Sequence, residues 1–141
     1  MAERPFYLLD THIWFWLVRG REGKLAADTA ANLEKAALHA PLGVSVISAW
    51  EVALSASKGR IGFGMPVQDW VQSALGRPGF MVMDLTPGIA VESCNLPGTF
   101  HADPADRFLV ATARIRNAVL VTRDKRILKY GEHGHVRTMA A

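Results

Sequence analysis

Four carboxylates in this sequence of 141 residues have the types and spacing that could do chemistry: Asp10, Glu51, Asp106 and Asp124. Asp10 ends the apolar run at 6–10, and Asp124 directly follows the apolar run at 118–122. If folding brings the four together, they repel one another and are pushed towards protonation unless cations intervene. The sequence therefore directs attention to a cation site.

The segments around these acids alternate between short apolar runs and helical patterns. Strands are expected at 6–10, 42–47, 80–85 and 118–122, with an edge strand at 135–139. Helices are expected at 12–20, 25–39, 48–59, 66–75, 103–117 and 124–131, with a short one after Thr86-Pro87. This alternation predicts an α/β protein, one domain over residues 1–141, whose parallel sheet is covered by helices on both faces.

In a parallel sheet, ligands bind beyond the carboxyl ends of the strands. Three of the acids lie at or just past such an end, and the helix that carries Asp106 could begin at the same edge. Oxygen ligands without a Cys or His cluster favour Mg²⁺ or Mn²⁺ over zinc. Two such ions about 3.5–4 Å apart can activate a water and stabilise both oxygens of an in-line phosphoryl displacement. The pattern therefore predicts metal-dependent phosphodiester chemistry.

Each acid also has a structural alternative. Ser48 and Glu51 have the spacing of a capping box, with Ser48 as N-cap. Asp103 and Asp124 each precede a predicted helix and could cap it. Asp10 could cap the first helix, but an acid after three apolar residues at a strand end is costly unless it is used. The coincidence of four acids at one edge favours the metal site.

Composition sets weaker limits. The net charge is +3 with a pI near 9.4, and residues 101–141 hold eight of the 16 Lys and Arg residues. That distribution suits a polyanionic partner, although solubility alone could explain it. No segment approaches the roughly 20 apolar residues of a membrane span, so we expect no membrane association. The single cysteine, Cys94, suits a reducing cytoplasm, where we place the protein.

Four stretches resemble a PIN-domain ribonuclease, specifically the VapC-like toxins of type II toxin–antitoxin pairs. They are "YLLDTHIWFW", "SVISAWEVALSASKGRI", "LPGTFHADPADRFLVATA" and "LVTRDKRI", which cover nearly the whole chain in the family's order. The resemblance implies a three-layer α/β/α fold with a mainly parallel five-stranded sheet. It also implies cleavage of RNA, with transfer RNA as a candidate, using Mg²⁺ or Mn²⁺.

The resemblance assigns roles to individual residues. Asp10, Glu51, Asp106 and Asp124 match the acidic set, and we expect Asp10 and Asp106 to hold the main metal ion. Thr11 matches a hydroxyl of the family's site, as does Thr122. The resemblance further implies a cognate antitoxin protein and a homodimer. The apolar helix around 13–17 could face such a partner or lie in the core.

The basic residues beside the acids are candidates for contacts with the RNA backbone: Arg107, Arg123, Lys125 and Arg126. His101 could touch substrate, although a solvated loop histidine is the simpler interpretation. Within "HADPADRF" we assign Asp103 to capping the helix and Asp106, one turn further, to holding metal.

Other classes fit the sequence less well. A ribonuclease H-like fold places antiparallel strands after the first Asp, where this chain has a helical pattern. A response-regulator receiver would have adjacent acids after the first strand. A haloacid dehalogenase phosphatase needs Asp-x-Asp, whereas this chain has Asp10-Thr11-His12. A non-catalytic PIN-like scaffold that binds RNA or protein stays open as the alternative, although the intact acids count against it.

Overall fold

A five-stranded, all-parallel sheet forms the centre of the structure, a computed structural model that describes residues 5–20 and 24–141. The strand order is β3-β2-β1-β4-β5, so β1 is central. The strands are β1 (Tyr7–Leu9), β2 (Leu42–Ser45), β3 (Phe80–Met83), β4 (Val119–Thr122) and β5 (Thr138–Ala140). The predicted parallel sheet is confirmed, including the edge strand near the C-terminus.

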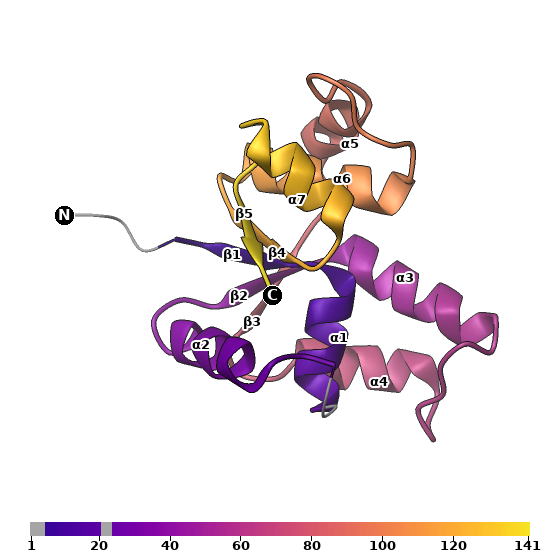
Figure 1. Cartoon of the computed structure of the whole chain (residues 1–141). Helices are drawn as coiled ribbons and strands as arrows, with labels where there is room; N and C mark the ends of the chain where they lie inside the picture. Colours follow the sequence, from indigo (N-terminus) through magenta and orange to yellow (C-terminus); the bar gives the residue numbers. More distant parts are fainter. Residues whose placement is uncertain (1–4, 21–23) are drawn as a thin grey trace.

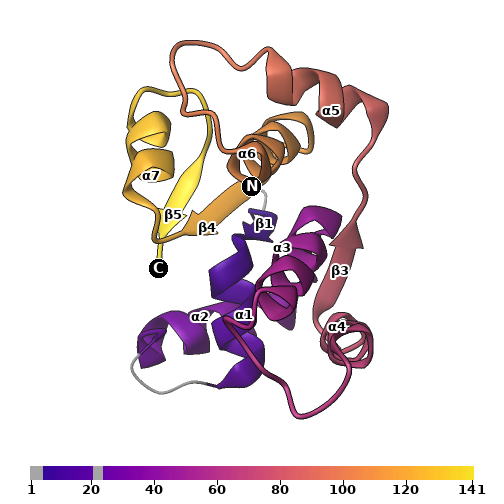
Figure 2. The same ribbon diagram turned by 90° about the vertical axis from the view of Figure 1, so that its right-hand side faces the viewer.

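Helices cover both faces of this sheet, which gives the three layers expected from the sequence. Helices α5 (Pro87–Cys94), α6 (Pro104–Ile115) and α7 (Lys125–Glu132) lie on one side (Figure 1). Helices α1 (Thr11–Arg19), α2 (Ala27–Ala37) and α4 (Val67–Leu75) lie on the other. Helix α3 (Val46–Ser57) projects from the carboxyl edge of the sheet and lies between α6 and α4 (Figure 2).

Strands β1, β3 and β4 are mostly apolar because each supplies side chains to two separate cores. In β1, Leu8 packs in the core under α5, α6 and α7, whereas Leu9 packs in the core under α1, α2 and α4. In β4, Leu120 and Val121 divide in the same way. Successive side chains of a strand point to opposite faces, so a sheet covered on both sides needs continuous apolar runs. The centre of the sheet is therefore a rigid platform for whatever follows β1 and β4.

The start of α3 differs from the prediction. The strand ends at Ser45, whose side chain caps α3 by accepting from the Ile47 N–H at 3.1 Å. Ser48 is therefore inside the helix, fully buried, and the predicted Ser48–Glu51 capping box is wrong. The β-branched run Val46-Ile47 imitates a strand, but the cap at Ser45 and burial of Ile47 make it helical. This frees Ser48 and Glu51 for other contacts.

The start of α6 agrees with the prediction. Asp103 is the N-cap, its side chain accepts from the Asp106 N–H at 3.0 Å, and Pro104 takes the first helical position. Asp106 is thereby freed from capping and lies in the first turn. Asp124 caps α7 through the Arg126 N–H at 2.8 Å. Within the residues described, no helix has the length and apolar character needed to cross a membrane.

Candidate active site

Asp10 is the most deeply buried of the four acids, because it lies where the central strand β1 passes into α1. Its carboxylate accepts from the Thr11 N–H at 2.7 Å and from the Thr122 hydroxyl at 2.6 Å. Burial raises the pKa of Asp10, and these two hydrogen bonds oppose the rise. The side chain is thus fixed in one orientation between β1 and β4.

Thr11 connects Asp10 to Glu51. Its hydroxyl donates to Glu51 Oε1 at 2.5 Å and lies 2.8 Å from the buried Ser48 Oγ. Because the single Thr11 proton goes to Glu51, Ser48 must be the donor in the second bond. Burial raises the pKa of Glu51, and the hydroxyl of Thr11 lowers it in part. Helix α3 therefore delivers Glu51 to the end of β1 through a chain of two hydroxyls.

Thr122 connects Asp10 to Asp124 in a similar way. Its hydroxyl donates to Asp10 and accepts from the Asp124 N–H at 3.0 Å. Burial acts to raise the pKa of Asp124, but the hydrogen bonds and positive charge of Arg126 outweigh it, so the pKa is lowered. The last residue of β4 thus sets the positions of two acids.

Asp106 has the strongest electrostatic conflict. Its pKa is raised to about 7, first by burial and then by the negative charges of Asp103, Asp10, Asp124 and Glu51. The structure therefore brings the four predicted acids into one electrostatically coupled cluster, which we call the acidic edge: Asp10, Glu51, Asp106 and Asp124. Such coupling between carboxylates at one place is typical of a site that functions with a cation.

Arg126 lies over two members of the acidic edge. Its guanidinium is 3.1 Å from Asp124 Oδ2 and 3.7 Å from Asp106 Oδ2, and its side chain is 61% exposed. An exposed arginine of this kind is held weakly and can move away when another cation arrives. Arg126 offsets part of the clustered negative charge in the described structure.

His101 is closer to the acidic edge than the sequence indicated. Its Nε2 lies 3.1 Å from Asp106 Oδ2, without the alignment of a hydrogen bond, and its Nδ1 accepts from the Asp103 N–H at 3.3 Å. Burial and then the nearby Arg126 lower the pKa of His101. The accepting Nδ1 and the lowered pKa both favour a neutral imidazole with its proton on Nε2, beside Asp106.

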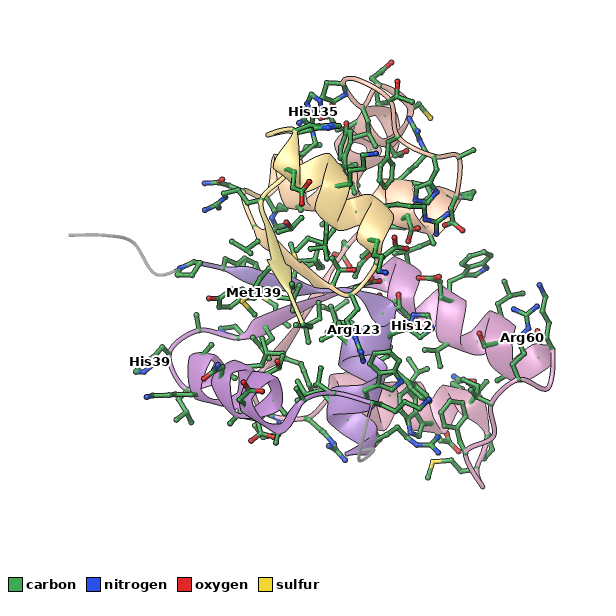
Figure 3. The ribbon with its side chains drawn as sticks, in the orientation of Figure 1. His12, His39, Arg60, Arg123, His135 and Met139 are labelled. Atoms are coloured by element: carbon green, nitrogen blue, oxygen red, sulfur yellow. The ribbon has the colours of Figure 1, made fainter. Side chains whose placement is uncertain are left out.

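The other basic candidates have different surroundings. The Arg107 guanidinium donates to the backbone carbonyls of Ser93, Phe100 and His101, so it braces the loop between α5 and α6. Arg123 lies over the Trp16 ring at 5.3 Å and donates to the Lys24 carbonyl, and Figure 3 shows it beside α1. Lys125 is exposed. RNA contact by these residues stays a prediction.

Two residues near the acidic edge have surroundings that differ from the interpretation favoured in the sequence. Ser48 was given a capping role, and His101 was interpreted as a solvated loop residue. Ser48 lies three positions before Glu51, so a correct helix start would have placed both on one face. His101 depends on how a loop folds back onto α6, for which the sequence carried no local signal.

Comparisons with known proteins find similar sequences over nearly the whole chain. The family model described as "PIN domain" matches residues 7–133. Ribonuclease VapC22 of Mycobacterium tuberculosis is 34% identical over 132 residues, covering 92% of this chain and 93% of that protein.

Solved structures share the fold at lower identity. One is VapBC2 from Rickettsia felis, bound to a DNA fragment from its promoter, with a TM-score of 0.72 at 19% sequence identity. The match covers 96% of this chain and 98% of that one. A toxin–antitoxin complex from Klebsiella pneumoniae has a TM-score of 0.60 at 24% sequence identity. That match covers 86% of this chain and 89% of the other. These similarities extend over most of the chain and show a shared fold.

Proposed function

The chain belongs to the PIN domain family, and from that premise we propose that it is a metal-dependent ribonuclease, the toxin of a toxin–antitoxin pair. The single observation that carries the proposal is the acidic edge, in which four carboxylates from four segments are coupled to one another. We take residues 1–141 as one PIN domain that hydrolyses phosphodiester bonds in RNA, with transfer RNA as a candidate substrate.

The donor chemistry of the acidic edge fits Mg²⁺ or Mn²⁺. Its carboxylates and the neighbouring hydroxyls offer only hard oxygen atoms. Among the residues described, no group of three or more Asp, Glu, His or Cys side chains is arranged so that it could hold a metal ion as it stands. We therefore propose that Asp106 and Asp124 exchange their contacts with Arg126 for the ion. Asp10, Asp106, Glu51 and Asp124 would hold it directly or through water.

A bound divalent ion supplies positive charge and water activation for in-line hydrolysis of a phosphodiester. The chain's own residues prepare the place for that chemistry. Thr11 and Thr122 hold Asp10 in one orientation, and Thr11 also fixes Glu51. The N-terminus of α6 directs its dipole at Asp106 and offsets part of the negative charge. Arg126, once released, is placed beside the RNA backbone.

Thr122→Val is expected to lower the cleavage rate about 10–100-fold, the usual effect of removing a residue that orients a metal ligand. The change keeps the shape of the side chain but removes the hydroxyl that bonds Asp10 and Asp124. Initial cleavage rates of a labelled RNA measure it. Thr112→Val is the matched control, since that buried hydroxyl bonds only the Phe108 carbonyl within α6. An equal loss of rate in both variants would contradict the role of Thr122.

The proposal is tested with purified protein and a mixed RNA pool. With Mg²⁺ or Mn²⁺ we expect cleavage at a defined set of sites, and a chelator should abolish it until metal is restored. Binding of RNA without cleavage at any metal concentration would favour the alternative, a non-catalytic PIN-like scaffold. The raised pKa of Asp106, caused by burial and the neighbouring acids, favours the enzyme, because a scaffold gains nothing from it.

We also propose a cognate antitoxin and a homodimer as partners, and a cytoplasmic location. The solved toxin–antitoxin complex from Klebsiella pneumoniae, which has the same fold, supports the antitoxin. Val46 and Trp50, one turn apart on α3, are 39% and 52% exposed and offer an apolar surface for a second copy. Light scattering of the purified chain distinguishes monomer from dimer.

A further inference from the structure

We infer that the cavity between α1 and the segment after α3 binds a base of single-stranded RNA next to the cleaved phosphate. This inference rests on the proposed ribonuclease function and adds a site for the nucleotide. The cavity has a volume of about 460 Å³, within the usual range of small-molecule sites. Its lining includes Thr11 and Glu51, so it opens directly onto the acidic edge.

The walls of this cavity, which we call the α1 pocket, combine aromatic and apolar surface. Phe15 and Trp16 come from α1, Val52 from α3 and Ile61 from the following loop. Trp16 is half-buried, and its ring centroid lies 5.5 Å from that of His12. The Arg123 guanidinium lies 5.3 Å from the same ring, so a base that stacks on that face takes the place of Arg123. Half-buried aromatic rings beside a groove are the surfaces on which proteins stack unpaired bases.

Positive charge surrounds the same pocket. Arg19, Lys24 and Arg60 line it, and among the lining residues that the structure describes the one carboxylate is Glu51, at the end nearest the acidic edge. Arg19 is fixed, because its guanidinium lies 5.2 Å from the centre of the Phe15 ring, 5.5 Å from that of Phe63, and donates to the Gly62 carbonyl at 3.2 Å. Figure 3 shows Arg60 at the far end of α3, well away from His12 at the start of α1.

Aromatic walls with a cationic rim suit one nucleotide, whose base is flat and whose phosphates are negative. A segment of a protein partner could also meet such a surface. RNA is favoured because the pocket shares Thr11 and Glu51 with the acidic edge, where the substrate must lie for cleavage. A base paired within a duplex is stacked and cannot enter, so the pocket selects single-stranded regions.

Binding of short RNAs tests the pocket in an Asp106→Asn chain, which should not cut its ligand. The probes are fluorescein-labelled octamers of uridine, of adenosine and of abasic ribose phosphate, all with the same backbone charge. At least one octamer with bases should bind roughly tenfold or more tightly than the abasic one, as expected for a stacked base. Equal binding of all three, measured by fluorescence anisotropy, would overturn the inference without any further variant.

Two substitutions locate the contacts. Trp16→Leu should reduce the advantage of bases over the abasic octamer to about threefold or less. Arg60→Gln should weaken all three octamers alike, by roughly threefold, since it faces the backbone. Arg116→Gln, an exposed arginine at the end of α6, should change nothing. An undiminished base advantage in Trp16→Leu would contradict the pocket.

A cleavage assay with the original chain distinguishes failure of this inference from failure of the proposed function. If the chain cleaves an RNA pool but binds RNA equally well with and without bases, the base site in the α1 pocket is contradicted and the ribonuclease function is kept. No cleavage with any metal would remove the proposed function itself. With Trp16→Leu we expect a raised KM and little change in kcat. An unchanged KM together with lost inhibition by a partner protein would assign the pocket to that protein and contradict the RNA site.

Discussion

Asp106→Asn is expected to reduce RNA cleavage about a thousandfold or more while leaving the fold intact. The side chain is central to the acidic edge, and its negative charge is opposed by burial and by four other acids. Loss of an oxygen ligand to the ion would remove several kcal/mol of transition-state stabilisation, and each 1.36 kcal/mol is a factor of about ten in rate. Single-turnover cleavage of a labelled RNA measures the loss, and circular dichroism checks the fold.

Asp103→Asn provides the matched control, because it makes the same change three residues earlier. Asp103 is exposed and caps α6, and asparagine caps a helix about as well as aspartate. Its cleavage rate should stay within about threefold of the original chain. If Asp103→Asn lost activity and Asp106→Asn kept it, the division of roles between these two acids would be reversed.

Asp106→Asn is also expected to stabilise the metal-free protein, by roughly 5 °C in Tm at pH 8. Folding raises the pKa of Asp106 from 3.8 to about 7, so the folded state keeps a proton that the unfolded state releases near pH 4. Stability contributed by this residue is therefore lost as pH rises from about 4 to 7, and stays lost above pH 7. An asparagine avoids that cost. The expected change of roughly 5 °C in Tm is smaller than the full pKa shift would give, because the carboxyl group is partly exposed to water.

This effect is measured by recording the Tm of both chains at a series of pH values from 4 to 8, with a chelator present. The difference in Tm between the two chains should be smallest near pH 4 and grow until about pH 7. Addition of Mg²⁺ should then raise the Tm of the original chain and leave the variant nearly unchanged, because only ligand-bound folded protein gains stability. A difference in Tm that does not vary with pH would contradict the buried, proton-retaining state of Asp106.

Much of the fold could be predicted from the sequence because its strands are short, apolar on both faces and separated by capped helices. Asp103 with Pro104 at the start of α6 is one such cap, and the structure confirms it. The predicted boundary between β2 and α3 was wrong because Val46 and Ile47 have strand propensity. Their helical state is decided by the cap at Ser45 and by the packing of Ile47 in the core.

The acidic set was predictable because the carboxyl ends of parallel strands meet at one edge, which the sheet order confirms for β1 and β4. The hydrogen bonds and neighbours that adjust the pKa values of these acids were not predictable. The hydroxyl chain from Ser48 through Thr11 to Glu51 needs the correct start of α3, and the approach of His101 to Asp106 needs the folded loop. The α1 pocket joins residues from α1 and from the segment after α3, which no local pattern connects.

Titration of Mn²⁺ into the metal-free protein by calorimetry tests most directly whether the acidic edge is the metal centre. The original chain and Asp103→Asn are expected to bind Mn²⁺ with similar affinity, whereas Asp10→Asn and Asp106→Asn should lose at least tenfold in affinity. Binding of equal strength in all four proteins would place the metal elsewhere and contradict the account.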